Sequence, residues 1–220
     1  MGLGFHHMDS SLNWHAGPSG TLDFLNVLLN GHPLTERKRL SLWFRQMAPD
    51  EAHPGFNTAT AKRSKFFVDA ESASKAVAAL CGDGWEGYAA VALSNHDGKG
   101  QGRGGDANAV AMLGIVAELD FDQPATHKPA KPGPLGLTEA LGCVGVIPLS
   151  PTLIVQTGGG VGLWWLFDRP HILTDVSDRQ RWGVLSDGWQ RCWRAGAAEF
   201  SVRAGRQPWV PDSSGDAAVS

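Results

Sequence analysis

The spacing of apolar residues along the chain predicts four helices. Leu22, Leu25 and Leu28 recur at helical spacing, the pattern of a helix that packs one side against a core. Asp69 is suited to cap an Ala-rich helix that continues through residue 80, and Gly82 would end that helix. In order, the expected helices cover residues 21–29, 69–80, 137–143 and 175–200.

Strands are expected between these helices. Leu40, Leu42 and Phe44 alternate with less apolar neighbours, which is typical of a strand with one buried face. The expected strands cover residues 40–45, 87–93, 110–120, 153–155 and 161–167. A glycine-rich loop at 96–106 and a Pro-rich connector at 123–136 separate them. The sequence therefore predicts an α+β protein.

The last expected helix is amphipathic. Trp182, Leu185, Trp189 and Trp193 recur at helical spacing among several arginines. We interpret the Trp residues as core packing, and a platform on which nucleobases stack is the alternative.

Two apolar runs joined by glycine, PTLIVQTGGGVGLWWLFDRP at 151–170, predict a β-hairpin. Glycine at its tip lets another group approach the backbone closely. Backbone amides without side chains also form a concave surface that suits phosphate oxygens. The alternative is an ordinary flexible turn.

Composition narrows the function classes. Hydrophobic residues make up 42% of the 220 residues and charged residues 19%, a composition that favours a soluble globular domain. The net charge is −3, so any nucleic-acid binding would have to come from a local basic patch. No apolar run approaches the ~20 residues that span a bilayer, so no membrane partner is expected. Cys81, Cys143 and Cys192 are few, odd in number and far apart, which fits a reducing cytoplasm.

An acidic cluster ends the strand expected at 110–120. Side chains alternate across a strand, so Glu118, Asp120 and Asp122 would share one face. Hard divalent ions prefer such oxygen ligands, and two of them can clamp the reacting oxygens in phosphoryl transfer. A solvated acidic strand end is the alternative.

The order of these features resembles a known family. An acidic strand end, a Pro-rich connector, a short helix, a glycine hairpin and a Trp-rich helix follow one another. This order is similar to that of the primase-polymerase branch of the archaeo-eukaryotic primase superfamily, particularly the RepB-like primases of phages and plasmids. There a D-x-D-like motif precedes an S-G-G-G-x-H-x-Y-W hairpin, and a third acid precedes an R-x-x-R-x-P-G-T-like stretch. The resemblance spans about 87–216. It implies a two-lobed fold, with a central mixed or antiparallel sheet in an RRM-like catalytic lobe flanked by helices.

The resemblance also implies site residues. Glu118 and Asp120 match the two metal-binding acids of the first motif, and Asp122 is a substitute for either. Asp212 or Asp216, in the tail WVPDSSGDAAVS, matches the third acid. Together these acids would bind Mg²⁺ or Mn²⁺.

The glycine hairpin would border the nucleotide. Its tip, Thr157, Gly158, Gly159 and Gly160, matches the segment beside the triphosphate. The family's hairpin histidine is Gly162 here, so the grip on the nucleotide would be weaker or would come from Arg103. The sequence also stops before any R-x-x-R-x-P-G-T-like stretch. We therefore expect the domain, at 21–220, to lack its end. Residues 1–20 are expected to form a flexible tail.

The function implied is nucleotidyl transfer on a DNA template, with nucleoside triphosphates as substrates and a helicase domain or protein as a further partner. Two alternatives remain open. In the first, the chain is a degenerate primase fold that binds DNA or a protein partner without catalysis. In the second, it is a metal-dependent nuclease that uses the same acids.

Overall fold

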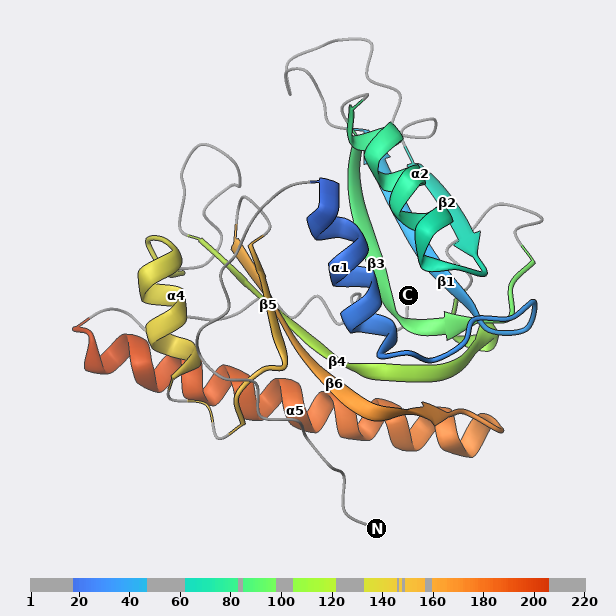
Figure 1. The fold of residues 1–220 in the computed structure, drawn as a ribbon. Helices are drawn as coiled ribbons and strands as arrows, with labels where there is room; N and C mark the ends of the chain where they lie inside the picture. Colours follow the sequence, from blue (N-terminus) through green and yellow to red (C-terminus); the bar gives the residue numbers. More distant parts are fainter. Residues whose placement is uncertain are drawn as a thin grey trace, which may run out of the picture. The chain divides into compact units, whose positions relative to one another are not determined.

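A computed structural model (Figure 1) describes residues 18–46, 62–82, 85–97, 105–121, 133–145, 147, 149–156 and 160–205. These residues form an α+β fold with a six-stranded sheet in the order β2-β1-β3-β4-β6-β5. They divide into two compact units. Unit 1 holds the described residues within 114–168 and 175–205, and unit 2 holds those within 18–113 and 169–174.

The elements follow the expected order closely. The strands are β1 (Arg39–Gln46), β2 (Lys62–Phe67), β3 (Trp85–Ser94), β4 (Ala109–Asp120), β5 (Leu153–Gln156) and β6 (Gly160–Ile172). The helices are α1 (Pro18–Leu29), α2 (Ala70–Gly82), the single turn α3 (Gly105–Asn108), α4 (Leu137–Val144) and α5 (Val176–Arg203). The four helices and five strands expected from the pattern are thus confirmed, and β2 is an additional strand. The expected tail, apart from the start of α1, and most of the Pro-rich connector lie outside the described residues.

In unit 2, β1 pairs antiparallel with both β2 and β3. Leu40, Leu42 and Phe44 of β1 are fully buried, as the alternation predicted. Helix α2 lies over this side of the sheet, because a Cβ built at Gly87 would meet the Phe44 ring at 3.3 Å and the Cys81 sulfur of α2 at 4.0 Å. The apolar side of β1 therefore packs beneath α2.

The predicted cap of α2 is present. The Asp69 carboxylate accepts a hydrogen bond from the Ser72 backbone N–H at 2.6 Å. This bond stabilises the charged carboxylate and holds the pKa of Asp69 below its ordinary value. The cap satisfies one of the N–H groups that the first turn of a helix leaves unpaired.

In unit 1, β5 and β6 form the predicted hairpin, and Leu153 faces Trp164 across it. One side of β4 and β6 packs with α4 and α5 in a single core (Figure 1). The buried members of this core are Ala117, Leu119, Phe121, Ala140, Cys143, Ile147, Val161, Leu163, Trp165, Trp193 and Ala197.

Helix α5 begins where Asp175 accepts a hydrogen bond from the Asp178 backbone N–H at 2.9 Å. The interpretation of its Trp residues as packing is confirmed. Trp182 and Trp193 are buried, and the Trp189 ring meets Trp165 edge-on at 4.8 Å. The expected position of Leu185 in that stripe is wrong, since this side chain is 45% exposed. The next residue, Ser186, is the buried one, because it lies four residues after Trp182 on the same side of the helix.

Among the described residues, no helix is both long and apolar enough to cross a membrane.

Candidate functional site

The end of β4 presents its acids as the alternation predicted. Ala117 and Leu119 are buried in the core beneath α4 and α5, whereas Glu118 and Asp120 are exposed. Since successive side chains of a strand point to opposite sides, the two carboxylates share the side away from this core. Both belong to unit 1.

The glycine hairpin reaches this acidic strand end. Gly160, the first residue of β6, lies so close to β4 that a Cβ there would stand 2.5 Å from the Leu119 carbonyl oxygen and 2.9 Å from the Asp120 Cα. The same Cβ would stand 3.2 Å from Oδ1 of Asp120. The end of the hairpin and the Asp120 carboxylate are therefore immediate neighbours.

A second close approach fixes the direction of the two strands. A Cβ at Gly114 would stand 2.3 Å from the Trp165 carbonyl oxygen. The middle of β4 thus lies beside the middle of β6, while the end of β4 lies beside the start of β6, so the strands run antiparallel. Sequence reasoning did not single out Gly114. A glycine inside an otherwise apolar strand was the available signal, since it often marks a close backbone approach.

Hydrogen bonds hold the hairpin on its β6 side. Thr152, just before β5, donates its backbone N–H to the Trp164 carbonyl at 2.8 Å, and its hydroxyl accepts from the Leu166 N–H at 3.1 Å. The indole of Trp165 donates to the Leu149 carbonyl at 2.9 Å from the buried side of the strand. These contacts fix the strand whose first residue touches Asp120.

Helix α5 supports β4, the strand that carries the two acids. Gln190 donates from its side-chain amide to the Val116 carbonyl of β4 at 2.8 Å. This bond and the core packing of Leu119 keep the acidic end of β4 in a defined position.

Gly162 stands where the resemblance expects a histidine. A Cβ here would be 3.2 Å from the indole nitrogen of Trp164 and 3.9 Å from the Val155 carbonyl oxygen. The nearest neighbour is a side chain, and a substitution at Gly162 would press on that side chain first. Trp164 and Trp165 point to opposite sides of β6, and both are buried and act as packing residues.

The structure thus brings together Glu118, Asp120 and Gly160. The remaining predicted site residues, Thr157, Gly158, Gly159, Arg103, Asp122, Asp212 and Asp216, lie outside the described residues. Within the described ranges no group of three His, Cys, Asp or Glu side chains is placed to hold a metal ion. Two neighbouring carboxylates nevertheless have the oxygen chemistry that Mg²⁺ and Mn²⁺ prefer, and a third ligand would have to come from elsewhere in the chain.

The thiol of Cys143, which lies in the same core as Leu119, has no part in such chemistry. Cys143 of α4 is fully buried in the core, and burial raises its pKa from 9.0 to about 12. The thiol therefore stays protonated and behaves as a small apolar side chain.

Comparisons of the chain with protein-family models, with curated proteins and with solved structures found no match.

Proposed function

We propose that the chain is a primase-polymerase-like domain of a phage or plasmid replication protein, which joins nucleotides on a DNA template. The observation that supports this proposal is the contact of Gly160 with Leu119 and Asp120. A carboxylate pair and a glycine hairpin that lie far apart in the sequence are thereby neighbours. A metal-bound nucleotide needs both at one place, because oxygen ligands hold the ions and backbone amides suit the phosphates.

Each residue has a defined role in this proposal. Glu118 and Asp120 would hold the divalent ions, with Asp122, Asp212 or Asp216 as the third acid. Bound Mg²⁺ or Mn²⁺ neutralises the negative charge of the phosphates. Gly160 gives the hairpin its close approach to the carboxylates, and Thr157–Gly160 would border the triphosphate. The oxygen of a primer or nucleotide 3′-hydroxyl forms a bond to the α-phosphorus, its proton passes to water, and pyrophosphate leaves with the electrons of the broken bond.

The direct test is template-dependent incorporation of labelled dNTP or NTP by the full chain with Mg²⁺ or Mn²⁺. Asp120→Ala should abolish incorporation, because the pair would lose the carboxylate that touches the hairpin. Asp187→Ala is the matched control, since Asp187 is an exposed acid on α5 and should be dispensable. Unchanged incorporation by the Asp120→Ala protein would contradict the metal assignment.

Gly162 favours a second candidate function, a degenerate domain that binds DNA or a replication partner without catalysis. Glycine offers the triphosphate neither a side-chain donor nor a charge, so this strand position contributes no grip. Isothermal titration with dNTP distinguishes the two functions. Affinity that depends on Mn²⁺ supports the enzyme, and its absence supports the degenerate domain. Degradation of DNA without added nucleotides would instead indicate a nuclease.

A further inference from the structure

The acidic part of β4 is held by a strand along one edge. The described pairing of β4 with β3 ends at Met112, which faces Ala92. β4 continues to Asp120, and the described strand beside this later part is β6, which approaches it closely at Gly114. The position of the carboxylates therefore depends on what holds the other edge of β4.

The hydrogen bonds of β6 tell which backbone groups of β4 point to that other edge. Trp164 and Leu166 turn their backbone groups away from β4, because both bond to Thr152 beside β5. Directly opposed residues of an antiparallel pair either bond each other or both point away. A Cβ at Gly114 would stand 2.9 Å from the Leu166 Cα, so these two residues are opposed and Gly114 also points away from β6.

The same direction recurs at every second residue of β4. Val116, Glu118 and Asp120 therefore offer their backbone N–H and carbonyl groups to the edge away from β6, whereas Ala117 and Leu119 bond toward β6. The contact of Gly160 with Asp120 fits the same register as the contact of Gly114 with Leu166.

Gln190 of α5 occupies this edge at Val116. Its side-chain amide donates to the Val116 carbonyl at 2.8 Å, in a partly buried contact. A carbonyl oxygen can only accept, so the amide nitrogen of Gln190 faces it. A helix side chain thus makes a bond that a further strand would otherwise make, two residues before Glu118.

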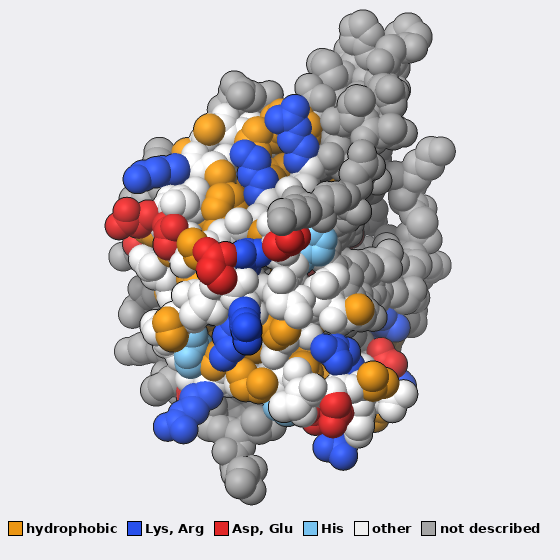
Figure 2. All heavy atoms as spheres, turned by 90° about the vertical axis from the view of Figure 1, so that its right-hand side faces the viewer, with side chains coloured by type: hydrophobic (Ala, Val, Ile, Leu, Met, Phe, Trp, Pro, Cys, Tyr) orange, Lys and Arg blue, Asp and Glu red, His pale blue; other side chains and the backbone are white. Residues whose placement is uncertain are grey.

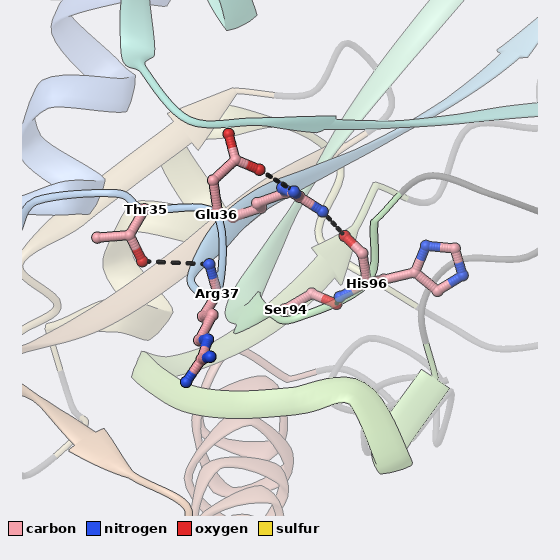
Figure 3. A network of polar contacts seen from close by, with 6 residues as sticks. Thr35, Glu36, Arg37, Ser94 and His96 are labelled. Atoms are coloured by element: carbon pink, nitrogen blue, oxygen red, sulfur yellow. Dashed lines mark hydrogen bonds and ion pairs between the residues drawn. The ribbon is translucent and has the colours of Figure 1, made fainter.

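A side chain also holds the end of a strand in unit 2 (Figure 3). Nη1 of Arg39 donates to the carbonyl of His96, just after β3, at 2.7 Å. Arg39 belongs to β1, so this bond ties two strands that are already paired. The Gln190 bond instead joins a helix to a strand edge, and the residues that follow are the proposed metal ligands.

We propose that Gln190 is a positioning residue of the metal site, which fixes the distance between the two carboxylates and the glycine hairpin. This role rests on the metal ligands proposed above, Glu118 and Asp120. A divalent ion needs its ligand oxygens within a narrow range of distances. Groups that hold the ligands from behind therefore contribute to metal affinity without touching the ion.

The test is the affinity of the full chain for Mn²⁺ alone, measured by electron paramagnetic resonance of the free ion. Gln190→Met keeps the length of the side chain and removes the donor, so it should weaken Mn²⁺ binding about tenfold. Gln190→Asn keeps the amide but is one methylene too short, and it should weaken binding to a similar extent. Gln180→Met is the matched control, because Gln180 is an exposed residue of the same helix and its variant should bind like the wild type.

Exposed acids also attract Mn²⁺, so binding at the site must be identified separately. Figure 2 shows Asp and Glu side chains scattered among Lys and Arg over one face of the molecule. Binding at the site is the part that Asp120→Ala removes and that Asp187→Ala, at an exposed acid of α5, leaves unchanged. Absence of such a part in the wild type would overturn the metal assignment of the proposed function and the role of Gln190 with it.

Hydrogen exchange in EDTA separates positioning from a general loss of stability. In Gln190→Met the Ala117 and Leu119 amides should exchange faster, by a larger factor than the amides of α5. An equal factor for both sets would mean lost stability alone and would overturn the positioning role. Wild-type Mn²⁺ affinity in a folded Gln190→Met or Gln190→Asn protein would overturn it as well, while the metal assignment would stand. Circular dichroism checks the fold of each variant, and either variant decides the outcome if the other does not fold.

Discussion

At Gly160 the space beside the residue, rather than its backbone torsion, requires glycine. The nearest atoms to an added Cβ belong to the backbone of β4, at 2.5 and 2.9 Å, and backbone cannot rotate away as a side chain can. Gly114 makes the reciprocal contact from β4 against Trp165. The separation of the two strands is thus set by the absence of a side chain at two places, the end of β4 and its middle.

Gly160→Ala should therefore lower the free energy of unfolding by about 1–3 kcal/mol, the usual cost of forcing an extra carbon into packed structure. Gly162→Ala is the matched control, two residues along the same strand. The nearest neighbour of Gly162 is the Trp164 indole at 3.2 Å, a side chain that can shift. Gly162→Ala should therefore lower the free energy of unfolding by less than Gly160→Ala does. Urea unfolding of both variants measures the difference. Equal losses would contradict the close-approach argument.

Cys143 should be inert in the folded protein. Burial raises its pKa from 9.0 to about 12, so its thiol is not ionised at pH 9, whereas Cys192 is exposed. Iodoacetamide at pH 9 should modify Cys192 quickly and Cys143 only after unfolding, as peptide mass spectrometry would reveal. Rapid alkylation of Cys143 in the native protein would show that the core around α4 opens.

The same shift makes stability depend on pH. Between pH 9 and about 12 the folded state keeps the Cys143 proton that the unfolded state has lost. The folded state therefore binds more protons in this window, and the contribution of Cys143 to stability, complete below pH 9, falls as the pH rises. Cys143→Ala should remove this part of the loss of stability at alkaline pH.

At the scale of elements, the sequence pattern predicted most helices and strands because their burial is one-sided. β1, α2 and the β5–β6 hairpin each carry a local signal: alternation, an N-cap or a glycine turn. β2, with the sequence KRSKFF, carried none. Lysine and arginine are typical of the exposed edge of a sheet, and β2 is the outermost strand beside β1.

The far end of β6 was missed for a related reason. The pattern ended this strand at Phe167, whereas it continues through Pro170 to Ile172. A proline normally argues against a strand because it lacks an N–H donor. Here β5 pairs only with Val161–Trp164, so the later part of β6 has no β5 partner to which it would donate.

The candidate site was predictable only in part. Alternation along β4 was enough to place Glu118 and Asp120 on one side and Leu119 in the core. The contact of Gly160 with Asp120 depends on which strands are neighbours, and the local pattern holds no information about that. The contact between Trp43 and Tyr88 was missed for the same reason, because the two residues come from separate strands.

At the scale of the whole molecule, the two compact units share continuous strands. β4 passes from unit 2 to unit 1 between Leu113 and Gly114, and β6 returns to unit 2 between Asp168 and Arg169. Domains that unfold independently are usually joined by exposed linkers that few contacts cross. Here each crossing lies inside a strand. Leu113 and Gly114 belong to a run of buried residues in β4, so fraying at this boundary would expose apolar surface.

We therefore expect the units to unfold together. Calorimetry should show one transition whose calorimetric enthalpy equals its van't Hoff enthalpy. Gly160→Ala alters unit 1 alone, yet it should speed global hydrogen exchange of the β1–β3 amides in unit 2 by the same factor as that of α5 amides. This holds because both sets of amides would exchange through the same global unfolding event, under conditions where refolding is faster than the chemical exchange step. If only the α5 amides responded, or if a second calorimetric transition appeared, the units would be energetically separate despite the strands they share.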